Sequence, residues 1–125
     1  MNETIFALAT AQGGALNVIR VSGDNAIDIV SRIFVPKRGA SLPERRTHSA
    51  VFGDICTCGT EVLDEALLTI MRAPHSYTGE DTVEISCHAS PYITQQIMIS
   101  LLDLGARQAE PGEFTMRAFL NGKMD

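Results

Sequence analysis

The chain has 125 residues, of which 45% are hydrophobic and 20% are charged, and its formal net charge is −5. This size and composition are typical of a single globular domain. The acidic balance argues against a surface given over entirely to nucleic acid. No apolar run reaches the ~20 residues that cross a bilayer. The N-terminus lacks the features of a signal peptide, so we expect a cytoplasmic protein.

The first part of the chain predicts two short strands and a helix. Residues 4–9 (TIFALA) and 16–22 (LNVIRVS) are rich in β-forming side chains and are separated by a glycine-containing turn. Ser22 is expected to cap a helix over residues 24–34, because apolar positions recur there at helical spacing. Together these segments predict two strands that lead into a helix.

A basic loop and a hairpin are expected next. Residues 36–46 (PKRGASLPERR) contain two prolines and a glycine, which favours a solvent-exposed loop. A weak phosphate contact in this loop stays open as an alternative. Residues 48–55 and 65–73 are predicted to be two antiparallel strands joined by a tip with the sequence C-T-C-G.

The second half alternates between strand and helix patterns. Residues 81–88 (DTVEISCH) alternate apolar and polar side chains, which predicts a strand. A helix should begin after Ser90 and end at Gly105. Residues 106–109 are expected to form an edge strand, and 111–122 a short helix. The predicted fold is therefore α+β, with a mixed or antiparallel sheet of about five or six strands and three helices.

The histidines and cysteines of the chain are residue types that bind metals, but their spacing in the sequence does not match that of common metal sites. His75 and His88 are thirteen residues apart, without the i, i+4 spacing of a helical metal pair. Cys56 and Cys58 form C-T-C, one residue tighter than C-x-x-C, and Cys87 is a third thiol. We interpret the cysteines as reduced thiols, with Cys87 in the core, and keep a zinc site as a minor alternative.

Glu84 and Arg20 are the unusual residues of the predicted sheet. Each is a charged side chain in the middle of an otherwise apolar strand, a position that disfavours charge. Two interpretations remain open. Arg20 pairs with Glu84 across the sheet, or both line a pocket in which a carboxylate binds a planar N–C–N donor array.

Common nucleotide-binding and hydrolase motifs are missing from the sequence. It contains no G-x-x-x-x-G-K-[ST] loop, no G-x-G-x-x-G fingerprint and no G-x-S-x-G elbow. The chain therefore lacks the common signatures of nucleotide-binding proteins and hydrolases.

Three stretches carry a resemblance to a known family. "TIFALAT" leads into "VIRVSG", "APHSYTGEDTVEISCH" contains P-x-S-[YF]-T-G-E-D, and "ARQAEPGEFTMRAFLNGKMD" contains P-G-E-F-[ST]-x-R-A-F-L-N-G-K. With these motifs the chain resembles, over all 125 residues, the N-terminal domain of the MnmE (TrmE) family of tRNA modification GTPases.

The resemblance implies a fold similar to tetrahydrofolate-binding domains of the aminomethyltransferase type. It implies that residues 1–125 form a folate-binding and homodimerisation domain, with the helical and GTPase domains of the family absent from this chain. GTP, magnesium and potassium would belong to the absent GTPase domain, so this chain alone is expected to hydrolyse no GTP and to modify no tRNA. The whole protein would modify the wobble uridine of tRNA together with the FAD protein MnmG. The alternative is a dimerisation or scaffold module without folate binding.

Site residues also follow from the resemblance. The family's contacts with a 5-formyl-tetrahydrofolate-type ligand fall on Arg20, Glu84 and Lys123 of this chain. The chain departs from the family at residues 11–15, where a P-P-G-R-G-type loop is usual, and at 89–90, where H-G-G is usual. The second departure removes a glycine next to a helix N-terminus, and both departures bear on the details of the expected pocket.

Overall fold

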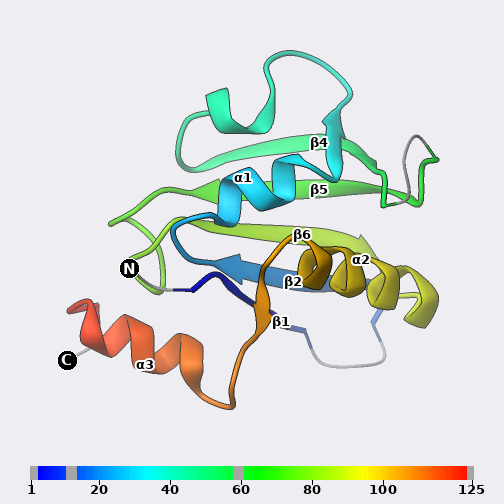
Figure 1. Cartoon of the computed structure of the whole chain (residues 1–125). Coiled ribbons are helices and arrows are strands. Elements are labelled where there is room, and N and C mark those ends of the chain that lie inside the picture. Colours follow the sequence, from blue (N-terminus) through cyan, green and yellow to red (C-terminus); the bar gives the residue numbers. More distant parts are fainter. Residues whose placement is uncertain (1–2, 11–13, 58–60, 124–125) are drawn as a thin grey trace.

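The computed structural model describes residues 3–10, 14–57 and 61–123. These residues form a mixed sheet of seven strands with three α-helices, which confirms the α+β prediction (Figure 1). The strand count is slightly higher than predicted. No helix in the described ranges is long and apolar enough to cross a membrane.

The strands follow the chain in this order: β1 Ile5–Leu8, β2 Leu16–Ser22, β3 Phe34–Pro36, β4 Ser49–Ile55, β5 Asp64–Met71, β6 Thr82–His88 and β7 Arg107–Gln108. The helices are α1 Ala26–Ser31, α2 Pro91–Asp103 and α3 Glu113–Leu120, with a 3-10 helix at Leu42–Glu44. In space the strands run β3-β4-β5-β6-β2-β1-β7. All neighbours are antiparallel except β1 and β7, which are parallel.

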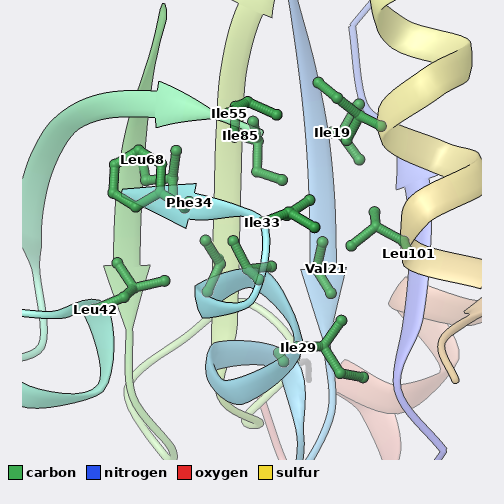
Figure 2. Packing of buried hydrophobic residues seen from close by; sticks show 14 of the residues in the cluster. Ile19, Val21, Ile29, Ile33, Phe34, Leu42, Ile55, Leu68, Ile85 and Leu101 are labelled. Atoms are coloured by element: carbon green, nitrogen blue, oxygen red, sulfur yellow. The ribbon is translucent and has the colours of Figure 1, made fainter. Parts of the chain in front are cut away.

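One face of the sheet carries the hydrophobic core. Strand β6 alternates as predicted, because Val83, Ile85 and Cys87 are fully buried while Glu84 and Ser86 are only partly buried. Helices α1 and α2 cover the buried face, where Ile29 and Leu101 pack toward Val21 of β2 (Figures 1 and 2). Removing these side chains from water is the main favourable term of folding.

The capping prediction for the long helix is confirmed. The hydroxyl of Ser90 accepts a hydrogen bond from the backbone N–H of Ile93 at 3.3 Å, and Pro91 occupies the first turn. Gly105 has φ of 103°, a left-handed conformation that ends the helix. The hairpin of β4 and β5 also forms as predicted. Part of its expected C-T-C-G tip, residues 58–60, lies outside the described residues.

The first helix is shorter than predicted, and Ser22 is not its cap. Helix α1 ends at Ser31, and Phe34 begins β3, which pairs with β4. Ile33 and Phe34 are buried, as the helical spacing predicted, but they lie beyond the end of α1. The hydroxyl of Ser22 donates to Glu80 instead, and the N-cap residue Asn25 makes no side-chain capping bond.

The close packing of β3 on β4 depends on Gly53. A Cβ at this position would lie 2.3 Å from the carbonyl oxygen of Val35 and 2.6 Å from Cζ of Phe34. We therefore expect Gly53→Ala to lower the free energy of unfolding by about 2 kcal/mol or more, as overpacked cores do. Urea denaturation measures this change.

Gly14→Ala is the matched control. A Cβ on Gly14 would meet only the carbonyl oxygen of Leu16, at an ordinary 3.7 Å. A Gly53→Ala variant as stable as Gly14→Ala would contradict the packing described for β3.

Candidate functional site

Arg20 and Glu84 are direct partners on the face of the sheet opposite the core. They are paired in the antiparallel register of β2 and β6. Arg20 Nε donates to Glu84 Oε2 at 2.8 Å, and Arg20 Nη2 lies 2.8 Å from the same oxygen. Their side chains remain 29% and 26% exposed. Cross-strand pairing is thus confirmed, and it leaves both groups accessible.

The pairing uses only one oxygen of the carboxylate. Both Arg20 nitrogens contact Oε2 of Glu84, and among the described residues Oε1 accepts no hydrogen bond. A carboxylate has about four lone-pair sites. Glu84 is therefore held in a fixed orientation by Arg20 and can still accept from a second donor.

Two aromatic rings flank the guanidinium of Arg20. Its Cζ atom lies 5.6 Å from the centroid of the Tyr77 ring and 5.8 Å from that of Phe114. Both distances are within the range of cation–π attraction. The hydroxyl of Tyr77 is 3.1 Å from Oγ1 of Thr115 on α3. The rings come from the turn before β6 and from α3, so two separate segments frame the charged pair.

A buried ion pair joins that turn to α3. Arg117 Nη1 donates to Glu80 Oε1 at 3.0 Å, and the two side chains are only 8% and 6% exposed. The hydroxyl of Ser22 donates to the same oxygen of Glu80 at 2.8 Å and lies 2.7 Å from Oγ1 of Thr78. We call Ser22, Thr78, Glu80 and Arg117 the buried polar network.

A second carboxylate fixes α3 to the edge strand β7. Glu113 receives two hydrogen bonds from Arg107, at 2.9 and 2.7 Å, and a third from the backbone N–H of Glu110 at 2.9 Å. The hydrogen bonds from Arg107 lower the pKa of Glu113 from 4.5 to about 2. They also raise the pKa of Arg107.

Lys123 lies beside the same turn as Tyr77. It is exposed, and its backbone N–H donates to the carbonyl of Ala118 at 2.8 Å just after α3. Its Cγ atom is 3.4 Å from the position of a Cβ built on Gly79. The structure thus brings Arg20 and Glu84 into contact and places Lys123 on the neighbouring turn. It records no hydrogen bond or ion pair between Lys123 and that pair.

The two histidines do not share a site. His88 Nδ1 lies 2.8 Å from Asp64 Oδ1, and the backbone N–H of His88 donates to the other carboxylate oxygen at 2.9 Å. His75 is exposed in the turn that precedes β6. His88 is therefore occupied by a local contact at the end of its strand.

The cysteines are equally dispersed. Cys87 is 1% exposed in the core, where burial raises the pKa of its thiol. Cys56 is partly buried, and Cys58 lies outside the described residues. Across residues 3–10, 14–57 and 61–123, no three His, Cys, Asp or Glu side chains group as a metal site. The zinc alternative gains no support from these residues.

Sequence reasoning missed the aromatic rings and the buried polar network. The signals were present in "SYTGED" and "GEFTMRAF", which hold Tyr77, Glu80, Phe114 and Arg117. No local pattern shows that these two segments, more than thirty residues apart in sequence, meet around Arg20.

Removal of one partner of the buried ion pair should be strongly destabilising. Glu80→Ala leaves the guanidinium of Arg117 buried without its main partner, so we expect a loss of about 3 kcal/mol or more in the free energy of unfolding. Urea denaturation tests this. Asp28→Ala breaks the exposed pair with Arg32 and should change stability by no more than ~0.5 kcal/mol. Equal effects of the two substitutions would contradict the buried role.

The pKa of Glu113 predicts a pH dependence of stability. Its folded pKa of about 2 lies below the ordinary 4.5, so its contribution is full above pH 4.5 and is lost as pH falls toward 2. Over that range, the free energy of unfolding should fall more steeply for the unaltered chain than for Glu113→Gln. Parallel curves from urea denaturation would show that Glu113 titrates normally in the folded chain.

Comparison with known proteins agrees with the motifs. The family model described as "GTP-binding protein TrmE N-terminus" matches residues 4–123. A tRNA modification GTPase MnmE of Bacteroides thetaiotaomicron is 59% identical over 98% of this chain and 26% of its own length. That of Flavobacterium psychrophilum is 54% identical over 99% of this chain and 27% of its own length. That of Symbiobacterium thermophilum is 49% identical over 98% of this chain and 27% of its own length.

The chain spans about a quarter of the length of these curated relatives. The family match extends over nearly every residue that the structure describes, including the strands and turn that carry Arg20, Tyr77 and Glu84. This chain belongs to the TrmE N-terminal family, the N-terminal domain of MnmE tRNA modification GTPases.

Proposed function

We propose that this domain binds a one-carbon tetrahydrofolate of the 5-formyl type at the site formed by Arg20, Glu84 and Lys123. The observation that carries the proposal is the one-sided pairing of Glu84, whose Oε2 is held by Arg20 while Oε1 has no hydrogen-bond donor among the described residues. An oxygen of a partly exposed carboxylate that is held in a fixed orientation is a specific acceptor for a ligand N–H.

The surroundings of the pair fit a flat, polar ring. A pterin presents an amino group and a ring N–H on one edge, and Glu84 is placed to accept from that edge. The rings of Tyr77 and Phe114, beside Arg20, offer apolar faces against which a planar ligand can pack. Arg20 retains guanidinium donors for a ligand carbonyl.

Lys123 would serve the other end of such a ligand. It is exposed and lies along Gly79, close to the turn that carries Tyr77. An ammonium group on a flexible stem suits the carboxylates of a folate's glutamate tail, which remain in solvent. In this arrangement Arg20 and Glu84 recognise the pterin ring of the folate, and the flexible side chain of Lys123 binds its glutamate tail.

In the wider assignment, residues 1–125 are the folate-binding and homodimerisation domain of a cytoplasmic tRNA modification GTPase. GTP, magnesium and potassium would be bound by a GTPase domain outside these residues. The folate would supply a one-carbon unit for the wobble uridine of tRNA, in a complex with the FAD protein MnmG. The names of the relatives support the tRNA and GTPase parts of this proposal.

An apolar face on α3 supports dimerisation near the site. Met116, Phe119 and Leu120 recur at i, i+3 and i+4, and they are 61%, 63% and 72% exposed. Side chains of this size on one helical face are typical of an interaction surface. Because the same helix contributes Phe114 to the site, a dimer formed there would lie next to the ligand.

Calorimetric titration with 5-formyl-tetrahydrofolate tests the folate proposal. We expect saturable binding that weakens at least tenfold in Glu84→Ala, because a charge-assisted hydrogen bond to the ligand is lost. Glu65→Ala is the matched control, since Glu65 is an exposed glutamate on the adjacent strand β5 that pairs with Lys37. No heat at millimolar ligand, or equal weakening in both variants, would overturn the proposal.

Light scattering tests the dimer separately. We expect the unaltered chain to be a dimer and Phe119→Asp to be a monomer with unchanged circular dichroism, because a buried, unpaired carboxylate is costly at an interface. Tyr92→Asp is the matched control, because Tyr92 is an aromatic residue with the same 63% exposure as Phe119 but lies on another helix, α2. A dimer that persists in Phe119→Asp would exclude α3 as the interface. A dimer with a flat folate titration would favour the scaffold module.

A further inference from the structure

The positive charge of this acidic chain is concentrated in one corner of the fold. Four of the eight arginines of the sequence lie in or next to the loop between β3 and β4: Arg38, Arg45, Arg46 and Arg72. We call these four residues the arginine corner. In Figure 1 the loop projects from the β4 side of the sheet, away from α3.

The arginine corner differs from the other arginines in having no carboxylate partner. Four arginines form ion pairs elsewhere in the fold: Arg20, Arg32, Arg107 and Arg117. Within the described ranges, no ion pair is recorded for any arginine of the corner. The one acidic residue of the loop, Glu44, accepts a hydrogen bond from Ser41. In a chain of net charge −5, unpaired guanidinium groups gathered at one place indicate an anionic partner.

Backbone carbonyls hold the corner in a fixed shape. Arg45 Nε donates to the carbonyl of Ala40 at 2.8 Å, and its Nη2 donates to the carbonyl of Arg38. Arg72 Nη2 donates to the carbonyls of Pro43 at 2.8 Å and Arg45 at 2.7 Å. Among the described residues, Nη1 of Arg45 has no hydrogen-bond partner. The loop is thus held in place by Arg45 within it and by Arg72 beside it, and further donors remain for an external phosphate.

An exposed aromatic ring lies beside these donors. Phe52 of β4 is 49% exposed, and with Lys37, Arg38 and Arg45 it lines a hollow of about 310 Å³. A phenyl ring next to guanidinium groups is the combination with which proteins bind single-stranded nucleic acid, because the ring stacks a base and the cations neutralise phosphates. Leu42, the apolar side chain of the loop, is 1% exposed and points into the core, so the loop has no leucine to insert into a membrane.

We propose that the arginine corner and Phe52 bind a single-stranded segment of RNA, with phosphates on Arg38, Arg45 and Arg46 and one base stacked on Phe52. This rests on the proposed function in tRNA modification and adds a contact surface to it. Arg72 follows the end of β5 and precedes the turn that carries Tyr77. The corner and the folate site are therefore at the same end of the sheet.

Fluorescence anisotropy with a labelled oligouridylate of about ten nucleotides tests this proposal. In Arg38→Gln/Arg46→Gln we expect affinity at low salt to fall roughly tenfold. The slope of log K against log salt should fall by about 1.4, as for two lost phosphate contacts on a single strand. Phe52→Leu should weaken binding roughly fivefold with an unchanged slope, because only stacking is lost.

Arg32→Gln is the matched control, since Arg32 is an exposed arginine paired with Asp28 on α1, and it should bind RNA like the unaltered chain. No binding at low salt, or equal loss in Arg32→Gln and the corner variant, would overturn the proposal. Tighter binding to anionic phosphatidylserine vesicles than to RNA would overturn it in favour of a membrane. The folate titration separates the two proposals, because the corner variants should retain folate affinity even if RNA binding fails.

Discussion

The buried ion pair between Glu80 and Arg117 is the interaction on which the candidate site depends. It joins the turn before β6 to α3, and Ser22 of β2 donates to the same carboxylate. Without it, the turn and the helix would keep uncharged contacts such as that between Tyr77 and Thr115, but would lose the buried ion pair that helps to hold Tyr77 and Phe114 on either side of Arg20. A buried ion pair of this kind fixes the relative positions of the two segments more than it adds to the net stability of the fold. The reason is that the free-energy cost of removing both charges from water offsets much of their electrostatic attraction.

The two faces of the sheet have different roles. The face toward α1 and α2 is apolar and supplies the core, whereas the opposite face presents Arg20 and Glu84 in register. Their partial exposure lowers the cost of placing charge in the centre of a sheet. Because their bond uses a single carboxylate oxygen, the pair is stable by itself and still open to a ligand. The pairing and ligand-binding interpretations of the sequence are therefore compatible.

Local patterns predicted most of the fold, and long-range contacts explain the rest. Alternation in β6 and the Ser90 cap depend on neighbouring residues, so they are readable from sequence. Strand β3 depends on its pairing with β4 and on the absence of a side chain at Gly53, against which the ring of Phe34 packs. The sequence near Phe34 contains no sign of these distant contacts. Ser22 matched a capping pattern but bonds to Glu80, fifty-eight residues away in the chain. Charge in the middle of a strand identified Arg20 and Glu84, whereas their aromatic neighbours required the tertiary structure.

Chemical-shift mapping of 5-formyl-tetrahydrofolate on the isotope-labelled chain tests the central claim most directly. We expect the largest backbone amide shifts on Arg20, Glu84 and the turn of Tyr77 and Gly79. The apolar hollow at the other end of the sheet, lined by Leu8, Asn17, Thr94 and Met98 among others, should be unaffected. Shifts concentrated on that hollow, with none at Arg20 and Glu84, would contradict folate binding at the Arg20–Glu84 pair.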